Sequence, residues 1–210
     1  EHLHLYNNQL TGDIPSEIGQ LINLENLQLF NNQLTGEIPS EIGQLINLEN
    51  LQLFNNQLTG EIPESIGSLI DLNSLILYNN QITGGIPYQI GNLTNVNFLY
   101  LNDNQLTGEI PFEICNIGDP IPSLFNNQLC PPYPDCISQS NIDSFDTSDC
   151  EQCPYSIEGD TNYNGYVNIS DIIVLISCIL ENNCDICLDI NFDGEIDVVD
   201  ITIIVGIILN

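Results

Sequence analysis

Lysine and arginine are both absent from this chain of 210 residues, which carries 29 aspartates and glutamates, two histidines and a formal net charge of −29 at pH 7. Proteins contact nucleic-acid phosphates through lysine and arginine, so the absence of both excludes nucleic-acid binding. It also excludes the usual salt bridges between side chains and makes metal cations the expected counter-ions. A chain without these residues offers no cleavage site to trypsin-type proteases, which suits a long-lived extracellular material.

Membrane-spanning and catalytic patterns are also absent. No apolar run approaches the length of about 20 residues that crosses a bilayer. No signal peptide is present, so we expect a mature chain or a fragment. There is no Ser/His/Asp or Cys/His constellation, and acids such as Glu17 and Glu41 recur evenly, whereas a glycosidase sets two carboxyl groups across a cleft. The sequence therefore predicts a protein that is not an enzyme.

A repeat occupies the first half of the chain. The pattern LxLxxNxL begins at residues that are 24 positions apart, namely Leu3, Leu27, Leu51, Leu75 and Leu99. This period resembles the leucine-rich repeat family, and the wording LTGxIPxxIGxL resembles its plant-type and bacterial subclass. The resemblance covers residues 1–129 and implies an α/β solenoid of short parallel strands, with a further strand near Thr-Gly-x-Ile-Pro. It implies binding surfaces rather than catalysis.

Side chains alternate along each predicted strand, so Leu27 and Leu29 point into the solenoid and Gln28 and Phe30 point out. One outward column is aromatic, and a fifth aromatic residue flanks it; the predicted binding surface on the concave face is Tyr6, Phe30, Phe54, Tyr78 and Tyr100. Such a stripe stacks sugar rings or holds an apolar protein surface, or it is a ladder that only stabilises the sheet. An asparagine column is expected to pair turn backbone: Asn8, Asn32, Asn56, Asn80, Asn104 and Asn127.

Acidic side chains form another column, at Asp13, Glu37, Glu61 and Glu109. Stacked strands lie about 4.8 Å apart, and like charges at that distance repel. We expect weakly bound Ca²⁺ along this column. The alternative is a solvated acidic edge that salt screens.

Eight cysteines allow up to four disulfides in an extracellular chain: Cys115, Cys130, Cys136, Cys150, Cys153, Cys178, Cys184 and Cys187. The segment 126–136 resembles the cysteine-bearing caps that close extracellular repeat solenoids, and we favour the local pair Cys130 with Cys136. Residues 130–156 are expected to form this cap and a linker. Two CxxC pairs also fit a four-cysteine zinc site, which the neighbouring calcium loops disfavour.

Two loops near the C-terminus place oxygen ligands at positions 1, 3, 5, 9 and 12, a glycine at position 6 and a backbone carbonyl at position 7, as Ca²⁺ requires. Their predicted ligands are Asp160, Asn162, Asn164, Tyr166, Asn168 and Asp171, and Asp189, Asn191, Asp193, Glu195, Asp197 and Asp200. The loops resemble the duplicated calcium loops of type I dockerin modules. The resemblance covers residues 157–210 and implies a small α-helical domain with two Ca²⁺ ions. The second loop has more carboxylates and should bind more tightly.

Residues 171–180 and 198–209 read as helices that are apolar nearly all round, which a module this small cannot cover alone. The dockerin resemblance implies a cohesin partner, contacted by Ile169 and Ser170 and by Val198 and Val199. The valine pair departs from the polar pairs of the best-known dockerins. The predicted interface as a whole comprises Leu3, Leu5, Val198, Val199, Ile204, Ile208 and Leu209.

Two hypotheses of function follow. The first is a secreted, non-enzymatic, calcium-binding structural or adhesive protein, in which the uncapped first repeat and the surplus apolar helix join copies head to tail into a filament or matrix. The second is an extracellular leucine-rich repeat module that binds polysaccharide or protein and is anchored, at a cell surface for example, through a dockerin–cohesin contact.

Overall fold

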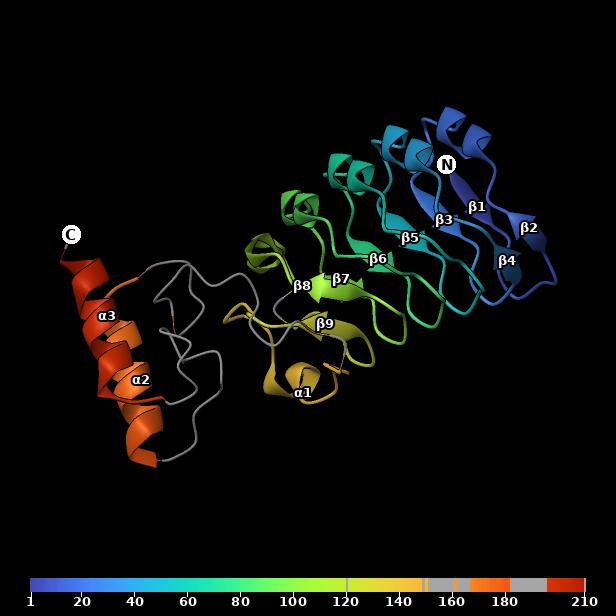
Figure 1. The fold of residues 1–210 in the computed structure, drawn as a ribbon. Helices are drawn as coiled ribbons and strands as arrows, with labels where there is room; N and C mark the ends of the chain where they lie inside the picture. Colours follow the sequence, from blue (N-terminus) through green and yellow to red (C-terminus); the bar gives the residue numbers. More distant parts are fainter. Residues whose placement is uncertain (120, 149, 151–160, 162–166, 182–195, 210) are drawn as a thin grey trace. The chain divides into compact units, whose positions relative to one another are not determined.

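The computed structural model describes all residues except 120, 149, 151–160, 162–166, 182–195 and 210. The chain divides into two compact units, Glu1–Asp149 and Cys150–Asn210. The first is a solenoid and the second contains a pair of helices (Figure 1). No helix in the described ranges is long and apolar enough to cross a membrane.

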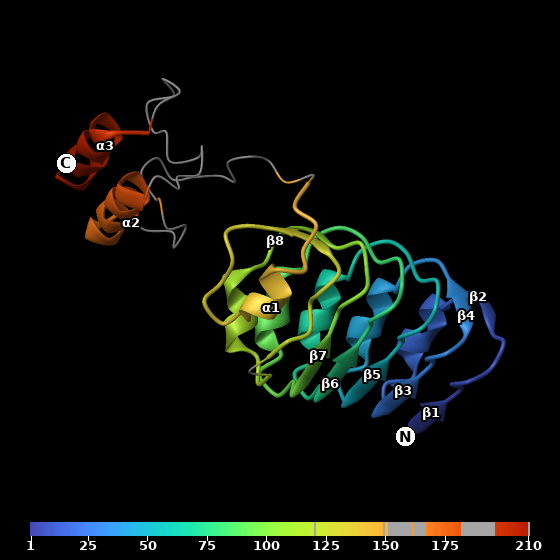
Figure 2. The same ribbon diagram turned by 90° about the horizontal axis from the view of Figure 1, so that it is seen from below.

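One parallel sheet of five strands runs along the solenoid. In spatial order its strands are β1 (His2–His4), β3 (Asn26–Gln28), β5 (Asn50–Gln52), β6 (Ser74–Ile76) and β7 (Phe98–Tyr100). Leu27 pairs with Leu51, and each strand pairs with residues exactly one repeat away. The central leucine of each strand from β3 to β7 is fully buried and its neighbours are at least partly exposed, except Ser74 at 3%, which confirms the predicted alternation in the other strands. Figure 2 shows these strands side by side.

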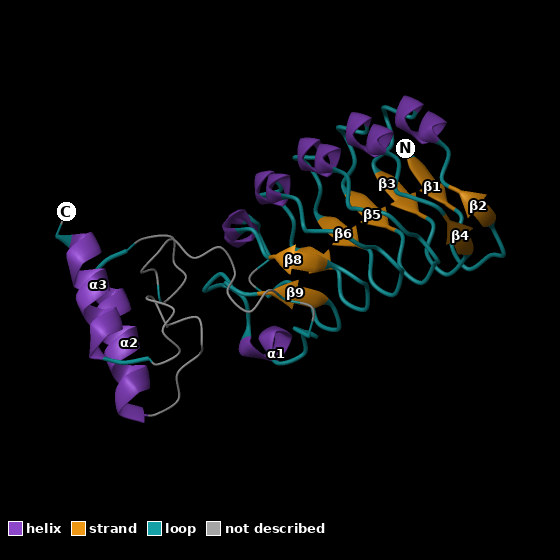
Figure 3. Ribbon diagram, in the orientation of Figure 1, coloured by secondary structure: helices purple, strands orange, loops and turns teal. Residues whose placement is uncertain are grey.

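A short 3₁₀ helix completes each coil. These helices are η1 (Ser16–Gln20), η2 (Ser40–Gln44), η3 (Glu64–Ser68), η4 (Tyr88–Asn92) and η5 (Phe112–Asn116), and they line up away from the sheet (Figure 3). A proline with φ near −65° precedes η2 to set the chain for the turn, and Ile42 within it is fully buried. At Gly43 an added Cβ would lie 2.5 Å from the Ser65 carbonyl oxygen, so glycine permits the close stacking of adjacent coils.

The further strand near Thr-Gly-x-Ile-Pro is present. β2 (Thr11–Asp13) pairs with β4 (Gln33–Thr35), β8 (Thr107–Glu109) pairs with β9 (Gln128–Cys130), and a single bridge joins Glu37 to Thr59. This confirms the strand that the plant-type resemblance implies.

The end of the solenoid is closed by a segment with the short helix α1 (Gln139–Ile142). Cys115 is bonded to Cys136, so the predicted pairing of Cys130 with Cys136 is wrong. Cys130, Cys150 and Cys178 are also disulfide-bonded. Ile137 and Phe145 pack on the last coil as part of the solenoid core. Cys153, Cys184 and Cys187 lie outside the described residues.

The second unit contains α2 (Ile169–Glu181) and α3 (Val198–Ile208). Leu175 and Ile204 are fully buried between them, with Ile208 packed alongside. The prediction that Ile204 belongs to an exposed interface is therefore wrong, because this side chain faces the other helix.

Candidate functional site

The asparagine column predicted to pair turn backbone does so. The Asn56 amide donates to the carbonyls of Leu29 and Leu53 at 3.1 and 2.9 Å, and its Oδ1 accepts the N–H of Leu34 at 3.1 Å. Asn127 repeats this arrangement at the last coil. One side chain thus joins two adjacent coils and holds the bend that follows each strand.

A second ladder was missed from the sequence. The residue before each of these asparagines has a positive φ between 53° and 55° in all six coils. Asn55 accepts from Asn79 at 2.7 Å and donates to Asn31 at 2.6 Å. The repeated Asn-Asn pair was the available signal, since asparagine tolerates the left-handed region better than most residues.

The aromatic column is a self-stacked ladder. Consecutive rings in this column have centroids 4.4 to 4.6 Å apart and interplanar angles of 2° to 15°, in the order Tyr6, Phe30, Phe54 and Tyr78. Both faces of the inner rings are covered by their neighbours, so only ring edges meet the solvent. Partial burial raises the pKa of Tyr78. Of the alternatives left open by the sequence, this geometry favours a stabilising ladder over a sugar-stacking platform.

Tyr100 lies apart from this ladder. Its ring meets Phe98 edge to face at a centroid distance of 6.3 Å, both on β7. The backbone of Ile121 lies next to β7, because Ser123 bridges to Tyr100 and the Asp119 carboxylate accepts the N–H groups of both Leu99 and Ile121. The sequence reading missed Ile121, although the two-residue alternation of Ile121 and Ser123 signalled a further strand-like segment.

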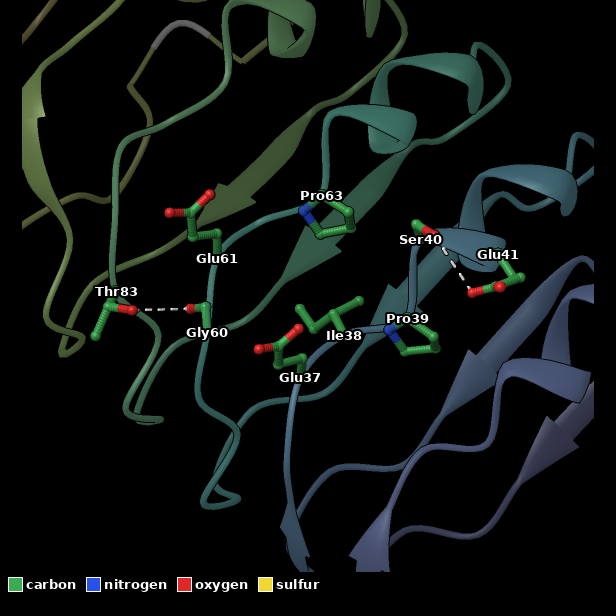
Figure 4. A pocket seen from close by; sticks show the side chains of 9 residues that line it. All are labelled: Glu37, Ile38, Pro39, Ser40, Glu41, Gly60, Glu61, Pro63 and Thr83. Carbon is green, nitrogen blue, oxygen red and sulfur yellow. Dashed lines mark hydrogen bonds between the residues drawn. The ribbon is translucent and has the colours of Figure 1, made fainter.

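The acidic column borders an open cavity of about 620 Å³. Glu37 and Glu61 project side by side from adjacent coils, and Pro39 and Pro63 occupy equivalent positions beside them (Figure 4). Asp13 accepts a hydrogen bond from the Thr35 hydroxyl at 3.1 Å. Within the described ranges no three acidic, histidine or cysteine side chains converge as a metal-binding group. Calcium along this column stays a prediction.

A smaller cavity of about 290 Å³ lies at the starts of the sheet strands, lined by Glu25, Glu49 and Asp71 with two asparagines. The Glu25 carboxylate lies 3.2 Å from the terminal amine and 4.0 Å from the His2 ring. The other nitrogen of that ring is hydrogen-bonded to Asn26. The Glu25 carboxylate therefore reaches the outward face of the sheet.

Four predicted calcium ligands fall within the described residues, and they form equivalent caps at the two helices. The Asp171 carboxylate accepts the Asn168 N–H at 2.8 Å, and the Asp200 carboxylate accepts the Asp197 N–H at 2.9 Å. The remaining predicted ligands lie outside the described residues: Asp160, Asn162, Asn164, Tyr166, Asp189, Asn191, Asp193 and Glu195.

The described ligands fit a calcium ion. Asp171 and Asp200 are fully buried, and a buried carboxylate is stabilised by hydrogen bonds such as those above and by a nearby positive charge. The chain has no lysine or arginine to supply it. A divalent cation bound by the oxygen ligands of each loop would supply this charge.

Each helix also carries an exposed stripe, and the two stripes correspond. On α2 the stripe is Ile169, Ser170, Ile173, Ile176, Ser177 and Leu180, and on α3 it is Val198, Val199, Thr202, Val205, Gly206 and Leu209. Every position in one stripe has its counterpart in the other at a constant shift. The large apolar members are between 36% and 79% exposed. The duplicated loops thus present two equivalent, largely apolar surfaces.

A family model described as Leucine Rich Repeat matches residues 1–21, 23–45, 47–69, 71–93 and 95–117, more than half of the chain. The chain belongs to the leucine-rich repeat family. A second model, the dockerin type I domain, matches residues 158–209. A comparison with curated proteins finds no match.

Solved leucine-rich repeat ectodomains from Arabidopsis are similar to the solenoid. The GASSHO1/SCHENGEN3 ectodomain, in complex with Casparian strip integrity factor 2, is 45% identical over 61% of this chain and 16% of that one, with a TM-score of 0.60. The HAESA ectodomain, in complex with a peptide hormone, is 36% identical over 69% and 24%, with a TM-score of 0.64. The BIR2 ectodomain is 33% identical over 63% and 71%, with a TM-score of 0.58. This leucine-rich repeat chain spans less than a quarter of the first two.

Proposed function

We propose that this protein is an extracellular, non-enzymatic interaction protein. The solenoid presents a binding surface, and the calcium-loaded dockerin unit attaches it to a protein partner of the cohesin type. The observation that carries the proposal is the pair of equivalent exposed stripes on α2 and α3. The Cys115–Cys136 disulfide supports an oxidising, extracellular setting. Both leucine-rich repeats and dockerins are interaction modules, and two of the similar ectodomains are complexes with a peptide hormone or a factor.

Calcium acts in this proposal through the helix caps. Asp171 and Asp200 close the first turns of α2 and α3 while serving as the last ligands of their loops. Binding of Ca²⁺ then fixes both helices and the stripes that they display. Removal of calcium takes a cation away from two buried carboxylates and should loosen the helix pair.

The test is capture of the full chain on an immobilised type I cohesin, with calcium or with a chelator. The variant Ile169→Ser/Val198→Ser alters one equivalent position in each stripe, and we expect it to weaken capture at least tenfold. Tyr88→Ser is the matched control, because Tyr88 is equally exposed but lies on η4 of the solenoid. Capture that neither the chelator nor the double variant reduces would refute the proposal.

Self-association through the same stripes is the competing proposal, with Leu3 and Leu5 of the first coil as the receiving surface of a head-to-tail contact. Leu209, exposed at the end of α3, favours it. Sedimentation velocity in millimolar calcium distinguishes the two. A monomer supports a foreign partner, whereas a calcium-dependent series of oligomers that Ile169→Ser/Val198→Ser disperses supports self-assembly into a filament or matrix.

A further inference from the structure

The outward face of the five-stranded sheet has two chemically different halves. On β3 and β5 it carries amide side chains, Asn26 and Gln28 followed by Asn50 and Gln52. Asn50 donates to Asn26 at 2.7 Å, whereas the Gln28 and Gln52 side chains make no hydrogen bond within the described structure. These two glutamines therefore have donors and acceptors to offer to a ligand.

The other half of this face is apolar. Phe98 is 47% exposed with Tyr100 beside it, and Ile121, on the segment next to β7, is 68% exposed. The patch is held by one carboxylate, since Asp119 accepts the N–H of Leu99 at 2.8 Å and that of Ile121 at 2.9 Å. A partly exposed aromatic pair next to an exposed isoleucine, fixed on paired backbone, is a surface that suits a large apolar side chain.

Acidic side chains gather at the strand starts on this side of the solenoid. The cavity at the strand starts has Glu25, Glu49 and Asp71 in its lining, and Glu25 reaches the outward face of the sheet beside His2. The terminal amine pairs with Glu25, whereas Glu49 and Asp71 form no ion pair within the described residues, and the chain has no lysine or arginine to neutralise them. A cationic side chain from another molecule would do so, and long-range attraction would steer it there.

We propose that this face binds an extended, basic peptide segment of a protein partner. A large apolar residue of the peptide packs on Phe98, Tyr100 and Ile121, its backbone bonds Gln28 and Gln52, and a lysine or arginine enters the Glu25–Glu49 cavity. The distance from β7 to β5 and β3 is two to three strand spacings, about 10 to 14 Å, which an extended chain covers in about three to five residues. The inference rests on the proposed function of the solenoid as a binding surface and names its partner class.

The experiment measures binding of short fluorescent peptides to the full chain in calcium. The probe carries a phenylalanine and an arginine about four positions apart in a glycine-serine background. Its controls replace the arginine by glutamate or the phenylalanine by serine. We expect the probe to bind at least tenfold more tightly than either control and to weaken as salt rises.

Variants of the protein locate the contact. Phe98→Ser and Glu49→Gln should each weaken the probe at least fivefold, whereas Phe112→Ser and Glu113→Gln, exposed on η5, should leave it unchanged. The inference would be overturned if the glutamate peptide bound as tightly as the probe. It would also be overturned if the η5 variants weakened probe binding as much as Phe98→Ser and Glu49→Gln do. A binding preference for neutral polysaccharide over every peptide would also overturn it.

The two proposals can fail separately. Cohesin capture depends on the stripes of α2 and α3, and peptide binding depends on the sheet. Loss of peptide binding with capture intact removes only this inference. Peptide binding with no calcium-dependent capture removes the proposed attachment and leaves this inference standing.

Discussion

At the scale of single residues, the fold depends most on asparagines that serve as internal backbone partners. A solenoid coil turns after every strand, and each turn leaves carbonyls and N–H groups that no strand can pair. Asn56 satisfies groups from its own coil and from the coil before it. A buried polar group that loses its partner costs about 1 to 3 kcal/mol, so these side chains carry more stability than their exposure suggests.

Asn56→Ala should lower the free energy of unfolding by about 2 to 3 kcal/mol, because it removes all of these bonds at once. The measurement is urea denaturation followed by circular dichroism. Gln57→Ala is the matched control: the neighbouring side chain is exposed, and the change should stay within about 0.5 kcal/mol. Equal destabilisation by both variants would contradict the role given to Asn56.

The repeat period predicted the buried leucines and the asparagine column, whereas the pairing of particular side chains was predicted less well. The period of 24 residues fixes which leucines are buried and which asparagines stack, since each coil repeats the same environment. The pairing of Cys115 with Cys136 could not be obtained in this way. It depends on how η5 and the closing segment meet in space, and the closing segment does not repeat.

At the scale of elements, the aromatic ladder shows how a repeated surface position acquires a structural role. In parallel, in-register strands the same side chain recurs about 4.8 Å away, close to the stacking distance of aromatic rings. Phe54 is covered by Phe30 on one face and by Tyr78 on the other. Strand alternation predicted that these rings point outward, and it left open whether they stack on one another or offer their faces to a ligand.

Phe54→Leu keeps an apolar side chain and removes two stacked pairs. We expect it to lower the free energy of unfolding by about 1 to 3 kcal/mol and to leave binding of the peptide probe unchanged, because the ring faces are not offered to a ligand. Tyr88→Leu is the control, because the Tyr88 ring is exposed and has no stacking partner in the described structure. It should change the free energy of unfolding by less than about 0.5 kcal/mol. Loss of probe binding in Phe54→Leu without loss of stability would contradict the ladder.

The helices of the second unit show a different limit of sequence reasoning. Their composition is apolar nearly all round, so the sequence marks surplus apolar surface without saying which side chains provide it. Ile204 is buried against the other helix, whereas Val198 and Leu209 are exposed. The orientation of each helix is set by its cap at Asp171 or Asp200 and by its partner helix. Periodicity alone does not contain that information.

At the scale of the whole molecule, the dominant feature is uncompensated negative charge. In the described structure Glu25 forms an ion pair with the terminal amine, and the His2 ring lies 4.0 Å from the same carboxylate. Carboxylates that have no ion-pair partner and bind no cation repel one another, which opposes the compact state. Salt shortens the Debye length from about 30 Å at 10 mM to about 3 Å at 1 M, so ionic strength should act strongly on this chain.

We therefore expect the unfolding temperature to rise by several degrees between 10 mM and 1 M salt, and to the same extent in sodium chloride and tetramethylammonium chloride.

The variant Asp13→Asn/Glu37→Gln/Glu61→Gln/Glu109→Gln decides between the two interpretations of the acidic column, a screened edge or a calcium site. If the column is a screened edge, the variant is more stable at low salt and converges with the parent at high salt. If the column binds calcium, millimolar calcium stabilises the parent more than the variant, although both retain the dockerin loops. Differential scanning calorimetry of both chains in the three salts separates these outcomes, because screening depends on ionic strength alone and coordination depends on the ion.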